Sequence, residues 1–192
     1  MKKGLLFIIS GPSAVGKTTV ASEFLKEENN LLSRIVTCTS RTIRNGEVNG
    51  VDYYFLTREE FIQHKKNGDF VEMSEVYGNY YGVLLSTIHE NIEQGKDSLL
   101  VINWEGYLKI KKIFKSRVIG IFLTPPSIED LETRIRNRGT DSEEIIKQRM
   151  KMIEEDMRHK HEFEFCIENA ILKHTVTDII NIVRNEIKKR ET

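Results

Sequence analysis

A glycine-rich loop between an apolar run and a helical pattern constrains the fold of this chain more than any other feature. Residues 11–18 read Gly-Pro-Ser-Ala-Val-Gly-Lys-Thr and match G-x-x-x-x-G-K-[ST] at every fixed position. The apolar run at residues 5–9 predicts a buried strand before the loop, and residues 18–26 carry a helical pattern after it. Such a loop aims backbone N–H groups and the positive end of a helix at one centre, so it predicts a phosphate-binding site.

Strand and helix patterns alternate along most of the chain. Apolar runs at residues 99–102 and 118–123, with a weaker one at 165–167, predict further buried strands. Helical patterns follow at residues 105–114, 128–137, 141–161 and 176–187, the second of them after a capping box from Ser127 to Asp130. The alternation predicts an α/β core with a doubly wound parallel sheet, formed by residues 1–34 and 96–192.

Residues 35–95 show a different pattern. Aromatic segments at residues 53–55, 70–72 and 80–81 are separated by turns such as Asn45-Gly46. This stretch contains five of the six tyrosines, a concentration that suits planar or phosphate-bearing ligands and equally suits packing between strands. The pattern predicts a small mixed subdomain inserted into the α/β core.

The charge balance indicates which binding partners to expect, and the cysteines indicate the cellular compartment. Lys and Arg together number 29, as do Asp and Glu, so the chain has no net charge with which to attract nucleic acid or a membrane surface. No apolar stretch reaches the roughly 20 residues that cross a bilayer. Cys38 and Cys166 belong to no C-x-x-C pair and indicate reduced thiols. We therefore expect a cytoplasmic protein with no nucleic-acid or membrane partner, either a monomer or a homo-oligomer.

The glycine-rich loop also predicts the donor of a reaction. The Lys17 ammonium would reach the β- and γ-phosphates of ATP, and the Thr18 hydroxyl would ligate Mg²⁺. The sequence has neither the Asn/Thr-Lys-x-Asp and Asp-x-x-Gly motifs of a GTPase nor the Leu-Ser-Gly-Gly-Gln motif of an ABC-type ATPase. A small kinase is the remaining interpretation. The loop residues expected to bind ATP are Gly11, Pro12, Ser13, Ala14, Val15, Gly16, Lys17, Thr18 and Thr19.

Three further blocks resemble guanylate kinases, which are P-loop nucleoside monophosphate kinases. Residues 37–55, beginning Thr-Cys-Thr-Ser-Arg-Thr-Ile-Arg, and residues 70–82 are similar to the acceptor-binding region of that family. Residues 125–144 are similar to its lid. The resemblance spans nearly the whole chain. It implies a P-loop kinase core with a GMP-binding α+β insertion at residues 35–95 and a helical lid at about residues 134–150.

The resemblance also implies an activity and its residues. The reaction is ATP-dependent phosphorylation of GMP, and of dGMP, to the diphosphate with release of ADP, in purine nucleotide metabolism. Lys17 and the lid arginines Arg134, Arg138 and Arg149 have implied catalytic roles, and Asn169 an implied contact with adenine. The residues implied in substrate binding are Thr37, Arg41, Arg44, Glu47, Tyr53, Glu72, Tyr81 and Asn103.

Residue chemistry supports several of these roles independently. Arg41 and Arg44 offer forked donors that match a dianionic phosphate. The Glu72 carboxylate matches the N1–H and N2–H₂ donors of guanine, which adenine lacks. Arg134 and Arg138 are four residues apart and share a helix face, where a triphosphate would offset their repulsion.

The sequence departs from the family pattern at three positions and leaves two alternatives open. Family members usually carry acidic residues at the positions of Val101 and Asn103 and a hydroxyl residue at that of Val83, so an acid is missing or is displaced to Glu105. One alternative is a kinase for another nucleoside monophosphate or a sugar phosphate. The other is a silent module that binds a phosphorylated protein, although the intact phosphate loop argues against it.

Overall fold

A five-stranded parallel sheet forms the centre of the computed structural model, which describes residues 2–28, 31–76, 78–137 and 142–191. Each neighbouring pair of strands runs parallel, as the alternating pattern predicted. Strands that are buried on both faces need continuous apolar sequence, and β1 is buried along its full length. In spatial order the strands are β2 (Ser33–Arg34), β7 (Ser98–Val101), β1 (Leu6–Ser10), β8 (Val118–Thr124) and β9 (Phe165–Glu168).

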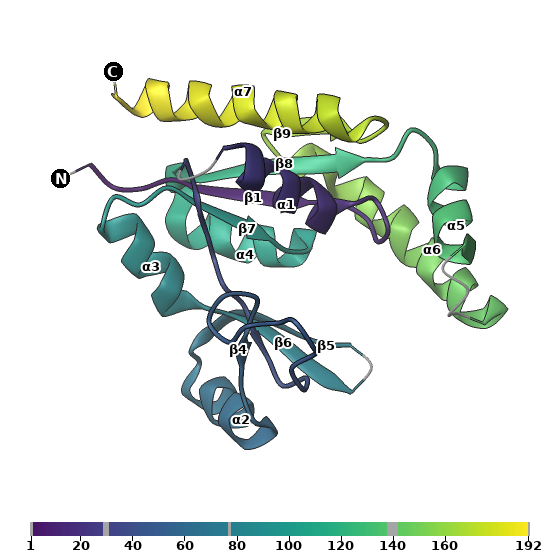
Figure 1. The fold of residues 1–192 in the computed structure, drawn as a ribbon, viewed down its shortest axis with the longest axis horizontal. Helices are drawn as coiled ribbons and strands as arrows, with labels where there is room; N and C mark the ends of the chain where they lie inside the picture. The colour runs from purple at the N-terminus through teal and green to yellow at the C-terminus, as the bar shows by residue number, and fades with distance from the viewer. Residues whose placement is uncertain (1, 29–30, 77, 138–141, 192) are drawn as a thin grey trace.

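Helices cover both faces of this sheet, and Figure 1 shows α7 and α4 on opposite sides of β1. Phe7 and Ile9 of β1 pack in one apolar cluster with α1 (Lys17–Glu27) and α7 (Leu172–Glu191). Leu6 and Ile8 pack in a second cluster with α3 (Leu85–Glu93) and α4 (Trp104–Phe114). Successive side chains of a strand point to opposite faces, so one apolar run supplies both cores. The doubly wound α/β fold is therefore confirmed.

A second, four-stranded sheet lies beside the core and appears below it in Figure 1. The helix α2 (Arg58–Asn67) covers this sheet through the buried Phe61, whose ring stacks on Phe70 with 4.4 Å between centroids. A reciprocal capping box of Thr57 and Glu60 starts the helix, and Gly68 ends it in the left-handed conformation. The strands, in spatial order, are β4 (Tyr54–Phe55), β3 (Cys38–Thr39), β6 (Asn79–Leu84) and β5 (Phe70–Val76).

The pairing within the second sheet is mixed, as the inserted pattern predicted. Strand β3 is parallel to β4, whereas β6 is antiparallel to both β3 and β5. The helix α3 follows β6 directly, and its Ile88 and Ile92 pack in the same cluster as Ile8 and Leu100 of the core. This helix therefore joins the second sheet to the core.

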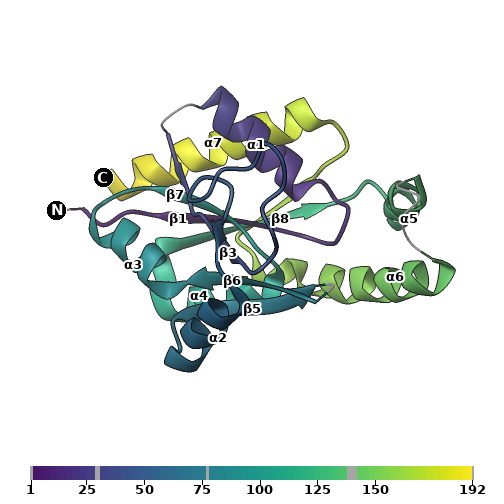
Figure 2. The same ribbon diagram turned by 60° about the horizontal axis from the view of Figure 1, so that its bottom comes forward.

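Two helices, α5 (Ile128–Asn137) and α6 (Glu143–Arg158), project beyond one end of the core sheet in Figures 1 and 2. Ser127 accepts a hydrogen bond from the Asp130 backbone N–H at 3.1 Å, which confirms the predicted cap of α5. Arg136 of α5 forms an ion pair with Glu132 of the same helix, at 2.8 Å, and links α5 to α6 through a second ion pair with Glu143. The predicted helix at 141–161 is shorter in the structure. It ends at Arg158 and passes into a 3₁₀ turn, η2 (His159–Glu162).

A buried polar group anchors the chain where β9 begins. Tyr107 of α4 is fully buried and stacks on Phe163, with 3.9 Å between the ring centroids. Its hydroxyl lies 3.0 Å from both Glu164 Oε2 and the Glu162 carbonyl oxygen, and the Gly120 N–H donates to Glu164 at 2.6 Å. Burial raises the pKa of Tyr107, so the hydroxyl keeps the proton that it donates.

None of the helices in the described ranges is both long enough and apolar enough to cross a membrane.

Candidate active site

The glycine-rich loop connects β1 to α1 with two backbone conformations that favour glycine. Gly11 has φ 142° and Gly16 has φ 103°, both in the left-handed half of conformational space. A Cβ on Gly11 would meet the Leu123 carbonyl oxygen, and one on Gly16 would lie 2.7 Å from Asn169 Nδ2. The fixed glycines of the motif are therefore required both by backbone conformation and by close packing.

The Lys17 ammonium lies inside this loop. Its Nζ donates hydrogen bonds to the carbonyl oxygens of Gly11 at 2.7 Å and Pro12 at 2.9 Å. Burial lowers the pKa of Lys17 from its ordinary value to about 8, and the nearby Asp156 carboxylate opposes that shift. The lysine thus carries its charge at a site where desolvation disfavours the charge, which is an arrangement suited to an anionic ligand.

The first turn of α1 faces a cavity of about 140 Å³. Thr18 and Thr19 are exposed, and the first turn contains no acidic residue that would neutralise the positive end of the helix. Thr18 lines the cavity together with Thr37 and Tyr53, two of the residues expected to bind substrate. The start of α1 and the residues that flank β3 and β4 therefore face a common space.

The structure assembles an arginine–tyrosine cluster from the second sheet. Arg41 Nη2 lies 2.6 Å from Glu47 Oε1, and the guanidinium carbon lies 5.6 Å from the centre of the Tyr53 ring. Tyr53 and Tyr81 pack edge to face with 6.1 Å between their centroids. Hydrogen bonding to Arg41 lowers the pKa of Glu47, so the pair is charged at neutral pH. Four of the residues expected to bind substrate are thus neighbours.

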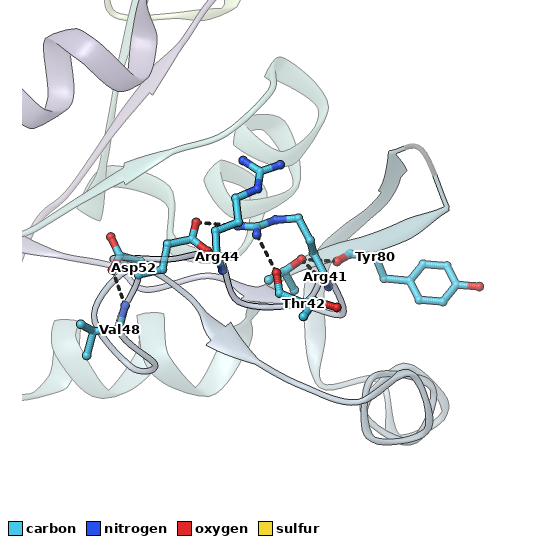
Figure 3. Close-up of polar contacts among 8 residues, drawn as sticks. Arg41, Thr42, Arg44, Val48, Asp52 and Tyr80 are labelled. Atoms are coloured by element: carbon cyan, nitrogen blue, oxygen red, sulfur yellow. Dashed lines mark hydrogen bonds and ion pairs between the residues drawn. The ribbon is translucent and has the colours of Figure 1, made fainter.

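Arg44 occupies a different position in the same loop. Its backbone N–H donates to Glu47 Oε2 at 2.7 Å, which closes the turn. Its side chain is exposed and extends away from the loop in Figure 3, whereas Arg41 also donates to the Thr42 carbonyl oxygen at 2.7 Å. One carboxylate therefore organises both arginines, although only Arg41 is paired with it through the guanidinium.

A second cavity, of about 210 Å³, contains the residue expected to recognise the base. Glu72 is only 8% exposed and lies opposite Val83, where the register between β5 and β6 shifts. Burial raises the pKa of Glu72, the positive charge of Lys109 lowers it, and the negative charge of Glu105 raises it. Residues lining this cavity include Thr37, Tyr53, Glu72, Ser74, Tyr81 and Asn103. Because Thr37 and Tyr53 line both cavities, the two cavities are neighbours.

The three departures from the family pattern all lie at this second cavity. Val83, Val101 and Asn103 line it. Asn103 also caps α4, because its Oδ1 accepts from the Gly106 N–H at 2.9 Å while its Nδ2 donates to Glu105 at 3.3 Å. The residue expected to contact substrate thus has a structural role that the sequence analysis missed. Its place just before a predicted helix was the available signal.

The three arginines expected in the lid differ in how the structure describes them and in how close they lie to the phosphate loop. Arg134 Nη1 lies 3.5 Å from the Val15 carbonyl oxygen, beside the phosphate loop. Arg149 is half-buried on α6. Arg138 falls outside the described residues, as does part of the expected lid at 138–141.

One acid near the loop was missed by the sequence analysis. Asp156 of α6 interacts electrostatically with Lys17 and forms a hydrogen bond with Trp104, whose ring stacks on His159 with 3.4 Å between centroids. Burial raises the pKa of Asp156, and the positive charge of Lys17 lowers it. The available signal was a carboxylate beside Met157 in the apolar stripe of α6.

The described residues include no cluster of three or more His, Cys, Asp or Glu side chains suited to hold a metal ion. A divalent cation at this site would therefore need most of its ligands from phosphate oxygens and water, as Mg²⁺ commonly does. The exposed Thr18 hydroxyl fits such a site as a single protein ligand.

Comparison with known proteins gives one consistent result. The family model described as guanylate kinase matches residues 3–186. A guanylate kinase of Rickettsia felis is 42% identical over 97% of this chain and 96% of its own length, and one of Oceanobacillus iheyensis is 40% identical over 99% and 91%. The crystal structure of guanylate kinase from Anaplasma phagocytophilum aligns with a TM-score of 0.75 and 34% identity, over 96% of this chain and 87% of that one. Since one family accounts for both the sequence and the fold, the chain belongs to the guanylate kinases.

Proposed function

We propose that this chain transfers the γ-phosphoryl group of ATP to GMP, and to dGMP, and releases ADP. The observation that carries the proposal is that the two cavities lie next to each other. Thr18 at the phosphate loop and Glu72 in the second sheet line neighbouring cavities that share Thr37 and Tyr53. A donor triphosphate and an acceptor monophosphate can therefore lie side by side, as transfer between them requires.

We propose that residues 11–19 bind the ATP phosphates. In this role Lys17 exchanges its hydrogen bonds with Gly11 and Pro12 for bonds to β- and γ-phosphate oxygens. Magnesium neutralises part of the phosphate charge when it is bound, and Thr18 is the protein ligand that we propose for it. Arg134, Arg138 and Arg149 then add positive charge around the transferred group.

On the acceptor side, Arg41, Tyr53 and Tyr81 are proposed to hold the GMP phosphate. Arg41 is preorganised for this role because Glu47 and the tyrosine ring fix the plane of its guanidinium. Arg44 extends away from the loop and would supply a second charge after a change of rotamer. Thr37, which lines both cavities, is proposed to contact the same ligand.

Guanine recognition is proposed to depend on Glu72 and Asn103. The Glu72 carboxylate can accept hydrogen bonds from N1–H and N2–H₂ together, and its burial keeps competing water away. Asn103 retains one amide N–H beyond its capping bond and its bond to Glu105. Val83 and Val101 offer only apolar contact through their side chains.

The chemistry that these residues support needs little covalent help. The acceptor phosphate is already an anionic nucleophile, so no general base is required. The protein's task is to align two polyanions and offset their repulsion. We propose that the insertion at residues 35–95 and the lid at about 134–150 close over the core and exclude water. Cys38 and Cys166 are both free thiols, which supports a cytoplasmic site of action.

The test is a coupled assay of ADP formation with magnesium, ATP and each nucleoside monophosphate in turn. We expect GMP and dGMP to be the preferred acceptors. Lys17→Ala should lower kcat/KM by about a hundredfold or more, since it removes a preorganised charge. Lys26→Ala is the matched control, because Lys26 is exposed on the same helix and pairs only with Glu23 among the described contacts. Equal rates with all acceptors would reject GMP as the substrate, and failure to bind ATP would favour the silent module.

A further inference from the structure

A buried carboxamide connects the start of α7 to the phosphate loop. Asn169 directly follows β9, and its side-chain Nδ2 donates to the Val15 carbonyl oxygen at 2.8 Å. Thr175 Oγ1 donates to Asn169 Oδ1 at 2.9 Å. Both residues are buried, with exposures of 8% for Asn169 and 1% for Thr175. The three residues form a continuous hydrogen-bonded chain from α7 into the loop.

Only one orientation of the Asn169 carboxamide satisfies these contacts. If the amide were rotated by half a turn, its oxygen would face the Val15 carbonyl oxygen, and two acceptors would oppose each other. The Asn169 backbone is itself fixed, because its N–H donates to the Thr124 carbonyl oxygen at 2.8 Å. The Thr175 hydroxyl has one proton, and its other acceptors, the Glu168 and Ile171 carbonyl oxygens, are both more distant at 3.3 Å.

Holding the Val15 carbonyl also sets the direction of the next N–H group. The peptide bond between Val15 and Gly16 is planar and trans, since the described chain has no cis peptide bonds. In a trans peptide the C=O and the following N–H point in opposite directions. With the Val15 oxygen held toward Asn169, the Gly16 N–H must point away from Asn169. The N–H groups of this loop motif are the donors that bind phosphate.

The packing around Gly16 supports the same conclusion. A Cβ at Gly16 would lie 2.7 Å from Asn169 Nδ2, so the carboxamide packs against the loop at a position that has no room for a side chain. Arg134 Nη1 approaches the same Val15 oxygen at 3.5 Å, but it is the longer of the two contacts and comes from a half-buried side chain. Asn169 is therefore the principal group that fixes this peptide plane.

We propose that Asn169 and Thr175 form a clamp that holds the phosphate loop in its anion-binding conformation, with Thr175 as a positioning residue for the bound nucleotide. The inference rests on the proposed function, because it assigns a role in binding the ATP phosphates. Thr175 touches no substrate in this role and acts through Asn169. The main contribution of Asn169 is then to the phosphate loop, whatever contact its second N–H makes with adenine.

The expected size of the effect follows from a population argument. Without the Thr175 hydroxyl, the Asn169 carboxamide loses one of the two bonds that fix its orientation, and the Val15–Gly16 peptide gains alternative orientations. If only about a tenth of the molecules keep the binding conformation, nucleotide affinity falls about tenfold. The acceptor pocket is formed by other residues, so GMP binding should be unaffected.

The experiment compares Thr175→Val with Thr175→Ser and with Thr177→Val. Valine has nearly the shape of threonine but no hydroxyl, whereas serine keeps the hydroxyl and loses the methyl group. Thr177 is exposed on the same helix and donates to the Lys173 carbonyl oxygen, so it controls for loss of a helical hydroxyl. Calorimetry measures the affinity of each variant for ADP with magnesium and for inorganic tripolyphosphate, and a kinetic assay measures KM for GMP.

We expect Thr175→Val to bind both ADP and tripolyphosphate about tenfold more weakly, with KM for GMP within about twofold of the unmodified chain. Thr175→Ser should bind both ligands normally, even where its melting temperature falls as far as that of the valine variant. Normal tripolyphosphate binding by Thr175→Val overturns the clamp, and so does weak binding by Thr175→Ser. If Thr175→Val does not fold, Asn169→Ala takes its place, and unchanged tripolyphosphate affinity would overturn the proposal.

These measurements separate the clamp from the proposed function. If the unmodified chain bound ADP but did not phosphorylate GMP, the proposed function would fail while the binding experiment still tested the clamp. A role for Asn169 in adenine recognition alone predicts that ADP affinity falls and tripolyphosphate affinity does not. That result would also overturn the clamp.

Discussion

The proton on Lys17 should be linked to nucleotide binding. In the structure the Lys17 ammonium is held by two carbonyl oxygens of its own loop, and burial lowers its pKa to about 8. A phosphate group stabilises the charged form, so binding should raise the pKa again. Above pH 8, where the free protein has mostly lost this proton, binding of ADP must therefore be accompanied by proton uptake.

The magnitude follows from the two pKa values. If binding restores the ordinary lysine pKa of about 10.4 from the free value of about 8, about 0.1 proton is taken up at pH 7, about 0.5 at pH 8 and about 0.9 at pH 9. The dissociation constant for ADP should rise about tenfold between pH 7 and pH 9, because only the protonated fraction of the free protein binds. The affinity is thus greatest below the free pKa and is lost as the pH rises above it.

Calorimetry in buffers with different enthalpies of ionisation measures this uptake directly. Lys17→Arg is the control, because a guanidinium remains charged over the whole range and should abolish uptake above pH 8. ADP binding with no proton uptake at pH 8 and pH 9 would show that Lys17 is already charged in the free protein. The proposed desolvation of the ammonium would then be wrong.

Two further predictions concern the acceptor pocket and the core. Glu72→Gln should lower kcat/KM for GMP by about 10- to 100-fold, because an amide mismatches one of two guanine donors. Glu75→Gln, an exposed change on the same strand, should have little effect in the same assay, and equal losses would refute guanine recognition by Glu72. Tyr107→Phe should lower the free energy of unfolding by about 1–3 kcal/mol in a denaturant titration, because Glu164 and the Glu162 carbonyl lose a buried donor. An unchanged midpoint would show that water replaces the hydroxyl.

The alternation of apolar runs and helical patterns was sufficient to predict the core. Each strand of the parallel sheet coincides within one or two residues with a predicted run, apart from the two-residue β2. These strands can be predicted from the sequence because a strand that is buried on both faces needs a continuous run of apolar residues, and such a run is visible within a few neighbouring positions. The end of α6 could not be predicted from the sequence. At that end His159 stacks on Trp104, a residue more than fifty positions earlier, and a contact over that separation leaves no local pattern.

The phosphate loop was equally accessible from the sequence, since its glycines, lysine and threonine are neighbours along the chain. What the sequence did not reveal is which groups hold the loop. Asn169 and Asp156 reach it from elements far along the chain, and their contacts depend on how β9 and α6 pack against it. A motif specifies backbone conformation, whereas its supporting residues are specified by the packing of other elements.

The amino-acid sequence by itself determined the kind of fold, the phosphate loop and the residue types available to an acceptor. Only the tertiary structure decided how those residues meet. A register shift between β5 and β6 places Glu72 opposite Val83 in the cavity, and the turn at Glu47 brings Arg41 onto Tyr53. The physical reason is the sequence separation of the interacting residues. Backbone conformation and burial pattern follow from residues that are close in the sequence. The direction of a polar side chain depends on partners that are distant in the sequence and that only folding brings into contact.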